Sequence, residues 1–327
     1  MTSSLSDLSV LFPDQPLSPN YVCAFAELVK NTRARRLWLG QSLRVETHQM
    51  LAYLAGAGLD VPVGTSVTLM PLRHPYEAGI QARSVAALTG QPTVAGFGAS
   101  TPAFVRAMRG EPYSSPRTAA REYLSIVRDV VEGRTPDRRG EYHVLSSMPV
   151  HPLEHPPVEI GAGVLRPGMA RTAGEVADVA ITWMTPPDYV RDILVPALKA
   201  GAAGKHPPPR VATVVHAAVD RPGRNLEDMA HTAAWRHLRA EHYTDMLRQA
   251  GVMAYADDPE AGAREILRHG VFVTGSPEEI ANELARYRRS GVDEVIVNPA
   301  GVLFTEGLEA SLVDLAEILA AAGGLDD

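Results

Sequence analysis

The chain has 327 residues, of which 45% are hydrophobic and 21% charged, and its formal net charge is −7. This composition is that of a compact globular protein and excludes a disordered or fibrous chain. The basic residues are scattered, which excludes the basic stripe that nucleic-acid or anionic-membrane partners require. The single cysteine, Cys23, excludes an intramolecular disulfide. Because the first residues lack a signal-peptide pattern and no apolar run is long enough to span a membrane, we expect a cytoplasmic protein.

Short apolar segments recur along the chain, and each is followed by a segment with helical periodicity. The segments expected to be strands are residues 8–12, 36–40, 63–70, 93–98, 158–162, 179–182, 210–219 and 294–298. Between and after them, helices are expected over 19–33, 45–57, 76–89, 115–132, 168–174, 187–200, 225–251, 259–268, 276–290 and 307–322. Residues 135–157, rich in Pro, Gly, His and Arg, interrupt this alternation as an insertion.

Eight strands that alternate with helices and are apolar on both sides predict a parallel sheet covered on both faces. An open doubly wound sheet would usually carry a glycine fingerprint after its first strand, and Leu11-Phe12-Pro13-Asp14-Gln15 offers none. The predicted fold is therefore a (β/α)₈ TIM barrel, formed by residues 1–327 as one domain with an insertion around 135–157.

The active site of such a barrel lies at the carboxyl ends of the strands. Most residues at these positions are small and uncharged, which suits a bulky planar cofactor held by backbone groups. Gly161-Ala162-Gly163, followed by Arg166, Pro167 and Gly168 at a helix start, has the pattern of a phosphate site. A βα turn that merely needs glycine explains these residues equally well, and Gly96-Phe97-Gly98 has the same ambiguity.

The sequence carries no pattern of a metal, hydrolase or nucleotide-hydrolysing site. His151 and His155 are four residues apart, but the prolines between and after them deny the helix that would place both side chains on one face. His231 and His242 are interpreted as part of a solvated helix face. Neither a nucleophile elbow nor a phosphate-binding P-loop is present.

Several segments carry a family resemblance. These are Thr65-Ser66-Val67-Thr68-Leu69-Met70-Pro71, Ala86-Ala87-Leu88-Thr89-Gly90-Gln91, Gly96-Phe97-Gly98, Pro156 to Gly161, Arg171 to Asp178 and Gly275 to Asp293. They resemble luciferase-like flavin and deazaflavin enzymes, and the similarity spans nearly the whole chain. Ile181-Thr182-Trp183-Met184-Thr185 and Glu122-Tyr123-Leu124 resemble one subgroup that depends on the deazaflavin coenzyme F420.

The resemblance implies a luciferase-like barrel with a non-proline cis peptide at Ser66-Val67 or next to it, where the third strand supports the cofactor ring. It also implies that the cofactor phosphate sits on backbone amides around Leu165 to Met169. The residues predicted to bind the cofactor are Gln41, Ser66, Val67, Thr68, Gly96, Phe97, Gly98, Gly161, Gly163, Leu165, Arg166, Gly168, Met169 and Trp183.

Two departures from the family pattern shape the predicted function. Gln41-Ser42 stands where dehydrogenases of this superfamily place an acidic residue and a histidine, and Ala99-Ser100-Thr101 stands where they place a carboxylate. Alcohol oxidation lacks its base here, whereas reduction by F420H₂ needs only a proton donor. We therefore expect an F420H₂-dependent reductase of a C=C or C=N bond, with Tyr21, His48, His74 and Tyr76 as candidate catalytic proton donors.

The expected substrate is an unsaturated small natural-product intermediate or a dehydroamino acid in a modified peptide, and the resemblance implies a homodimer. Two alternatives remain open. One is an FMN-dependent monooxygenase of the same fold, which would shelter a peroxyflavin from water. The other is a barrel that binds a cofactor without turnover, as a carrier or interaction protein.

Overall fold

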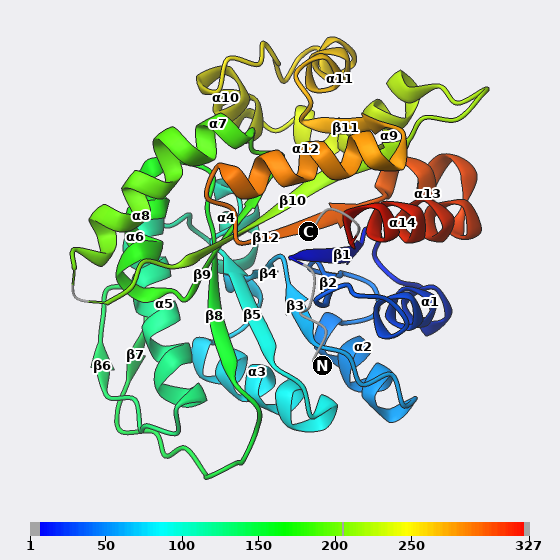
Figure 1. Cartoon of the computed structure of the whole chain (residues 1–327). Helices are drawn as coiled ribbons and strands as arrows, with labels where there is room; N and C mark the ends of the chain where they lie inside the picture. Colours follow the sequence, from blue (N-terminus) through cyan, green and yellow to red (C-terminus); the bar gives the residue numbers. More distant parts are fainter. Residues whose placement is uncertain (1–6, 205, 324–327) are drawn as a thin grey trace.

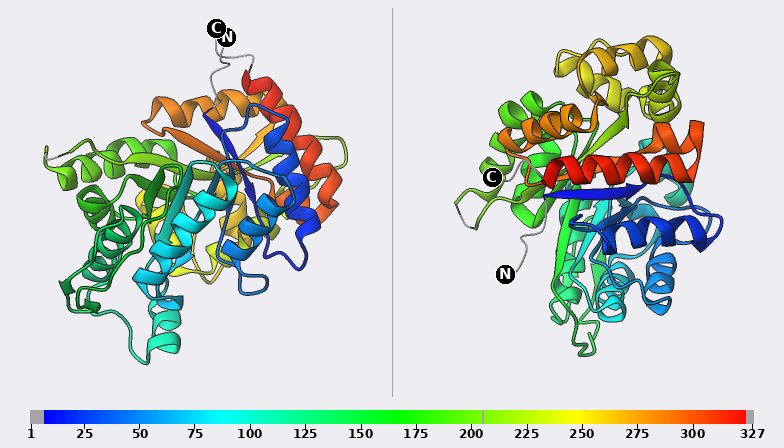
Figure 2. Two further views of the ribbon diagram at one scale, coloured as in Figure 1. Left: turned by 90° about the horizontal axis from the view of Figure 1, so that it is seen from below. Right: turned by 45° about the vertical axis from the view of Figure 1, so that its right-hand side comes forward.

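The computed structural model describes residues 7–204 and 206–323. Its main sheet is a closed parallel barrel surrounded by helices (Figures 1 and 2). The barrel strands, in chain order, are β1 (Leu8–Phe12), β2 (Leu37–Leu39), β3 (Val63–Thr65), β5 (Thr93–Gly98), β8 (Val158–Gly163), β9 (Val179–Trp183), β10 (Arg210–Val219) and β12 (Glu294–Asn298). The barrel closes because β10 pairs with both β9 and β12, and β12 pairs with β1. The predicted (β/α)₈ fold is confirmed.

The helices that surround the barrel mostly begin at a proline, whose fixed φ and missing N–H suit the first turn of a helix. They are α1 (Pro19–Lys30), α2 (Thr47–Gly56), α3 (Pro75–Thr89), α4 (Pro102–Arg109), α5 (Pro116–Val131), α6 (Pro167–Val176), α7 (Pro187–Tyr189), α8 (Val195–Ala202), α9 (Leu226–Leu238), α10 (Glu241–Gln249), α11 (Pro259–Arg268), α12 (Pro277–Arg289), α13 (Ala300–Glu306) and α14 (Leu308–Gly323). A 3₁₀ turn, η1 (Met70–Leu72), follows the third strand, and a π-helical turn, η2 (Val190–Leu194), joins α7 to α8.

Several details differ from the sequence-based expectation, and α4, α13, β6 and β7 were among the elements not predicted. The third predicted strand, 63–70, is divided into β3 and β4 (Thr68–Leu69), and the peptide between Ser66 and Val67 is cis, as the resemblance implied. The helix expected over 225–251 is divided into α9 and α10, because Ala240 adopts an extended backbone conformation. A strand that was not predicted, β11 (Phe272–Gly275), pairs with the outer half of β10.

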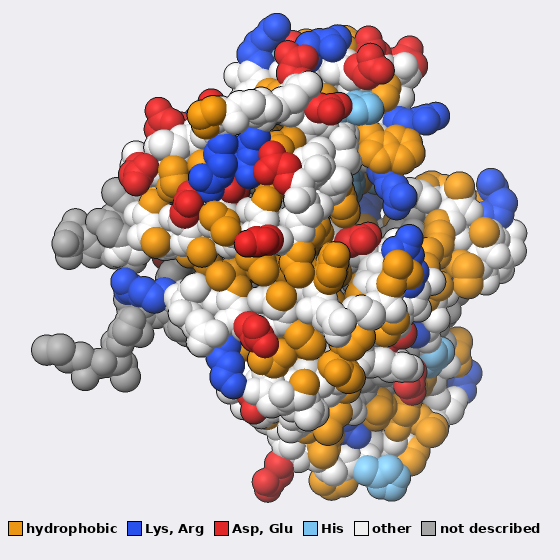
Figure 3. All heavy atoms as spheres, turned by 90° about the vertical axis from the view of Figure 1, so that its right-hand side faces the viewer, with side chains coloured by type: hydrophobic (Ala, Val, Ile, Leu, Met, Phe, Trp, Pro, Cys, Tyr) orange, Lys and Arg blue, Asp and Glu red, His pale blue; other side chains and the backbone are white. Residues whose placement is uncertain are grey.

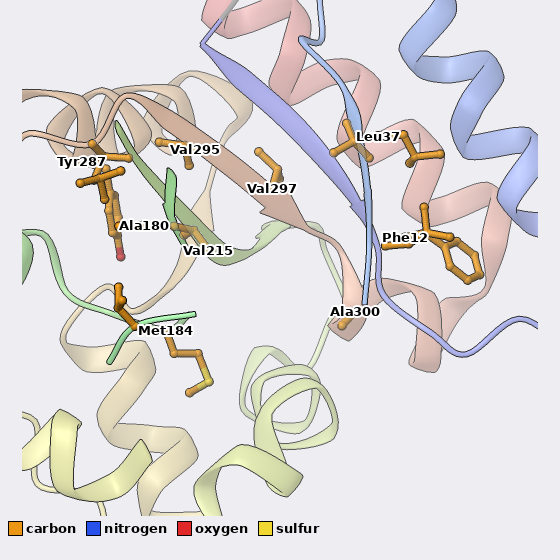
Figure 4. Packing of buried hydrophobic residues seen from close by; sticks show 14 of the residues in the cluster. Phe12, Leu37, Ala180, Met184, Val215, Tyr287, Val295, Val297 and Ala300 are labelled. Carbon is orange, nitrogen blue, oxygen red and sulfur yellow. The ribbon is translucent and has the colours of Figure 1, made fainter. Parts of the chain in front are cut away.

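Side chains alternate along the strands between the barrel interior and the helical layer. The interior is filled by a cluster that includes Leu11, Trp38, Val94, Val214 and Ile296. The opposite faces of the strands pack against the helices, and Figure 4 shows Phe12, Leu37, Val215, Val295 and Val297 in this outer layer. The barrel is thus a packed core rather than a pore.

A buried carboxylate closes the amino-terminal end of the barrel. Glu294 begins β12 and is fully buried. Its Oε1 accepts hydrogen bonds from Ser9 Oγ (2.6 Å) and Trp38 Nε1 (2.8 Å), and Arg36 Nε lies 3.0 Å from the same oxygen. This buried ion pair lies at the amino-terminal end of the barrel, away from the carboxyl ends of the strands, where barrels of this kind bind ligands.

The insertion carries a small hairpin of its own, formed by β6 (Arg138–Arg139) and β7 (Val144–Leu145). Glu122 on α5 holds the tip of this hairpin, because its carboxylate accepts hydrogen bonds from the backbone N–H groups of residues 141, 142 and 143 at 2.7–3.1 Å. A Cβ at Gly140 would lie 2.3 Å from that carboxyl group, so a larger residue there would displace the Glu122 side chain from the hairpin tip.

On the face that Figure 3 shows, acidic and basic side chains are intermixed, and neither kind forms a large patch. Within the described residues, no helix combines the length and the apolar character that crossing a membrane requires.

Candidate functional site

A cavity of about 830 Å³ opens at the carboxyl ends of the strands. Its walls come from the segments after β3, β5 and β8, from the end of β9, and from α10. The lining residues are Ser66, Val67, Leu69, Gly98, Ala99, Ser100, Thr101, Pro102, Pro116, Arg117, Gly163, Val164, Leu165, Arg166, Pro167, Gly168, Met169, Ile181, Thr182, Trp183, His242, Tyr243 and Gln249. All of these lie in the described part of the chain, and none is an Asp or Glu.

The inner wall of the cavity is shaped by Val67 and two glycines that face it. A Cβ at Gly98 would lie 2.6 Å from Val67 Cγ2, which is closer than real side chains approach, whereas one at Gly163 would meet Val67 Cγ1 at 3.5 Å. The absence of side chains at these glycines leaves a flat apolar surface beside Val67. Such a surface suits a planar ring.

One end of the cavity is suited to an anion. The helix α6 begins there at Pro167, and its first intrahelical amide bond is that of Ala170 to the carbonyl of Arg166. The preceding N–H groups, of Gly168 and Met169, have no partner within the helix and carry its positive dipole end. Arg117 lies beside Gly168, and Arg166 is next to the helix start.

The arginine next to α6 is also tied to the helix above the cavity. Arg166 Nη2 lies 2.6 Å from Asp245 Oδ2 on α10. On the same side, Tyr189 OH donates a hydrogen bond to Gln249 Oε1 at 3.4 Å. These contacts hold α10, and with it His242 and Tyr243, at the cavity.

The two titratable side chains that α10 contributes to the cavity lining, His242 and Tyr243, are neutral at physiological pH. Burial, with a smaller contribution from nearby Arg166, lowers the pKa of His242, so its imidazole is uncharged. Burial raises the pKa of Tyr243 well above its usual range, so its hydroxyl retains its proton.

Polar atoms without partners also lie at the cavity. Ser66 Oγ and Trp183 Nε1 are buried and make no hydrogen bond. Behind Trp183, the rings of His216 and His237 carry further unpartnered nitrogen atoms. In native structures such buried groups usually pair with water or a ligand. Within the described residues, no group of three or more His, Cys, Asp or Glu side chains is placed to hold a metal ion.

Most residues predicted to bind the cofactor line this cavity. They are Ser66, Val67, Gly98, Gly163, Leu165, Arg166, Gly168, Met169 and Trp183.

The other predicted cofactor residues lie behind the cavity wall. Gln41 Oε1 accepts a hydrogen bond from the N–H of Leu69 (3.1 Å), and Thr68 Oγ1 donates to the carbonyl of Gly96 (3.1 Å). Phe97 packs on Tyr123, and Gly161 lies against Ile181 inside the barrel. Gln41, Thr68, Gly96, Phe97 and Gly161 therefore shape the wall rather than line it.

The predicted proton donors lie elsewhere, and their catalytic role stays a prediction. Tyr21 is 51% exposed on α1. His48 is buried on α2, with Nδ1 2.9 Å from Glu46 Oε1. His74 caps α3 by accepting a hydrogen bond from the N–H of Tyr76 (3.2 Å), and the Tyr76 hydroxyl donates to the carbonyl of Pro149. None of these four described residues lines the cavity.

Sequence reasoning named none of Arg117, His242, Tyr243 and Gln249 as site residues, although it predicted that residues 231–258 as a whole help to shape the pocket. Arg117 lies in the first turn of α5, far from any strand end. The α10 residues follow β10 by more than twenty positions, and nothing in their periodicity distinguishes a helix that covers a cavity from one that faces solvent.

The family follows from these observations and from a direct comparison. The model of the luciferase-like monooxygenase family matches residues 5–294, so the chain belongs to this family, which is one of oxidoreductases. No curated protein sequence matches the chain.

Solved structures with the same fold include both deazaflavin and flavin enzymes. An F420-dependent secondary alcohol dehydrogenase, in complex with an F420-acetone adduct, is 16% identical, with a TM-score of 0.75 over 97% of this chain and 99% of that one. The coenzyme F420-dependent tetrahydromethanopterin reductase from Methanopyrus kandleri is 15% identical, with a TM-score of 0.72 and 98% of each chain covered. A type II Baeyer-Villiger monooxygenase from Pseudomonas putida, in complex with FMN, is 13% identical, with a TM-score of 0.69 over 98% of this chain and 99% of that one.

The cavity fits a flavin-type cofactor. Val67, Gly98 and Gly163 offer the flat apolar surface that a tricyclic ring requires, and Ser66 Oγ is an unpartnered polar atom at that surface. The free amides of α6, with Arg117 and Arg166, suit the phosphate that FMN and F420 both carry.

Proposed function

We propose that this chain is an F420H₂-dependent reductase that saturates a C=C or C=N bond of a small natural-product intermediate or a dehydroamino-acid substrate. The observation that carries the proposal is the charge of the cavity lining, which contains Arg117 and Arg166 and no carboxylate among its described residues. This lining favours a polyanionic cofactor and provides no acidic residue to accept a proton from an alcohol.

The reaction asks little of the protein once the reactants are held together. Reduced F420, when bound, supplies a hydride. The chain's own residues position the ring against Val67, hold the phosphate on α6, and provide a proton for the other end of the double bond. Among the titratable lining side chains, Tyr243 carries a hydroxyl proton at neutral pH, and burial raises its pKa further.

A titration of the purified protein with F420 and with FMN, followed by fluorescence, tests the cofactor assignment. We expect saturable binding of F420 at concentrations where FMN binds at least tenfold more weakly. The variants Gly98→Ala and Gly163→Ala, which each add a methyl group to this surface, should both weaken binding of the ring.

Turnover is then tested with F420H₂ and a panel of unsaturated amides, imines and enones under air and under nitrogen. A reductase oxidises F420H₂ at equal rates in both atmospheres and only when substrate is present. FMN preference together with substrate-dependent oxygen consumption would instead establish a monooxygenase. Binding of F420 without any turnover would support a carrier.

We also propose that the protein is a homodimer, on the family resemblance. Light scattering that gives a monomer mass at micromolar concentration would contradict this.

A further inference from the structure

Two imidazole rings are packed among aromatic side chains behind the inner wall of the cavity. His216, near the end of β10, lies between Trp183 and Phe272, with ring centroids 6.0 Å and 5.9 Å away. His237, near the end of α9, lies between Trp183 and Tyr243, at 5.1 Å and 4.9 Å. Trp183, which lines the cavity, contacts both imidazoles, and Tyr243, which also lines it, contacts His237.

Four polar atoms of this cluster have no hydrogen-bond partner. Both ring nitrogens of His216, Nδ1 of His237 and Nε1 of Trp183 are buried and unpaired. His216 as a whole is 1% exposed. A neutral imidazole carries one N–H donor and one nitrogen acceptor, and an indole carries one N–H donor. The cluster therefore contains hydrogen-bond donors without an acceptor and an acceptor without a donor.

The cluster is electrically neutral, which restricts what could bind there. Burial lowers the pKa of His216 to about 3 and that of His237 to about 4, so both rings are uncharged at physiological pH. The charged group that acts on them is the cation Arg236 beside His237, the neighbouring His242 is itself neutral, and no carboxylate is among the groups that affect either ring. An ammonium ion would find no counter-charge here, and a carboxylate would offer no donor for the imidazole nitrogen that needs one.

We propose that Trp183, His216 and His237 form an inner subsite that binds a neutral amide group of the substrate. An amide carries a carbonyl acceptor and an N–H donor, which complement the two kinds of atom that this cluster leaves unpaired. Because Trp183 lines the cavity and stacks on His237, entry of the amide requires the Trp183 side chain to move away from the imidazoles.

This inference deepens the proposed function, on which it rests for the identity of the reacting bond. It narrows the substrate to an unsaturated compound with an adjacent amide. A lactam and a dehydroamino-acid residue of a peptide share this chemistry.

The test uses the full chain labelled with ¹⁵N-histidine and small probes of matched size. The ¹⁵N resonances of His216 and His237, assigned with His216→Phe and His237→Phe, are followed during titration with N-methylacetamide, acetate and methylammonium. We expect N-methylacetamide to shift both resonances saturably, and the two ions to shift them at least tenfold less. An equal response to acetate, or no saturable response to the amide, overturns the proposal.

Variants distinguish a binding site from a packing cluster. His216→Phe and Trp183→Phe keep aromatic rings but remove the polar atoms, and each should weaken the amide response at least fivefold. His216→Gln keeps a donor and an acceptor and should restore part of it. If Trp183→Phe and His216→Phe both retained the full response to N-methylacetamide, the proposal would be wrong. F420 binding is measured separately on the same samples. A loss of F420 binding would count against the proposed function, whereas the amide titration would still test the subsite.

Discussion

The carboxylate of Asp245 on α10 lies 2.6 Å from the guanidinium of Arg166, the residue that immediately precedes α6. A single arginine therefore serves both the helix that covers the cavity and the helix start suited to a phosphate. When an anion binds at α6, it competes with Asp245 for the same cation.

Replacement of Asp245 by Asn should leave the fold intact and strengthen phosphate binding, because Arg166 loses its competitor. The ion pair is partly exposed, so its loss should cost about 1 kcal/mol or less of unfolding free energy. Arg166→Ala should weaken binding of both F420 and FMN at least tenfold, measured by fluorescence titration.

The control for Arg166→Ala is Arg171→Ala, which removes the same charge from an exposed position on α6. An equal loss of affinity in Arg171→Ala would show that only the overall charge matters. Weaker phosphate binding in Asp245→Asn would contradict the competition.

Gly98→Ala should reduce both stability and cofactor affinity. The added methyl group would lie 2.6 Å from Val67 Cγ2, and overpacking of this kind costs about 1–3 kcal/mol. Adding Val67→Ala should recover much of the stability, because it removes the methyl group that clashes. Urea denaturation measures this, and Gly163→Ala, with its ordinary 3.5 Å contact to the same valine, should be nearly neutral.

The buried histidines should make the protein less stable in mild acid. The folded-state pKa values of His216 and His237, about 3 and 4, lie below the value of about 6.5 expected in the unfolded chain. Their contribution to stability is therefore present above about pH 6.5 and is lost as the pH falls toward the folded values. The slope is about 1.4 kcal/mol per pH unit for each ring.

Denaturation of His216→Phe at pH 7 and pH 5 checks this slope. The variant should lose less stability between the two pH values than the wild type by about 2 kcal/mol. His151→Gln, which changes an exposed histidine, should keep the wild-type difference. If both variants behave alike, the acid sensitivity has another origin.

Glu294→Gln should be strongly destabilising without changing cofactor affinity. The substitution leaves buried Arg36 without its carboxylate partner at 3.0 Å, and breaking a buried pair of this kind costs about 3–5 kcal/mol. Glu283→Gln on the exposed face of α12 breaks a surface pair and should cost about 1 kcal/mol or less. A shift in F420 affinity in folded Glu294→Gln would contradict the assignment of the site to the opposite end of the barrel.

Much of the barrel could be predicted because its strands are apolar on both sides and stand apart from their helices. The bounds of β1, β5, β10 and β12 agree with the predicted ones, and the cis peptide was implied by the resemblance at Thr65 to Thr68. What could not be predicted depends on tertiary contacts. β11 exists because β10 extends beyond the barrel and offers a free edge, which no local pattern reveals.

The same limit applies to the site. The cavity walls after β5 and β8 could be predicted from the glycines in these segments, because the carboxyl ends of the strands meet at one end of the barrel. Arg117 and Tyr243 reach the cavity from helices, and only the packing of α5 and α10 brings them there. His242 was interpreted as part of a solvated face, whereas it is half-buried at the cavity.

Glu122 gives the insertion a consequence for protein engineering. The Glu122 carboxylate on α5 accepts hydrogen bonds from three backbone N–H groups of the hairpin tip. The conformation of the segment 135–157 therefore depends on a residue outside it. A chimera that received this segment from a relative would contain the hairpin but would lack the carboxylate that accepts its backbone hydrogen bonds, unless residue 122 also matched. The residue at position 122 would have to be exchanged together with the segment, which carries its own glycine at 140, because the hydrogen bonds join two distant parts of the chain.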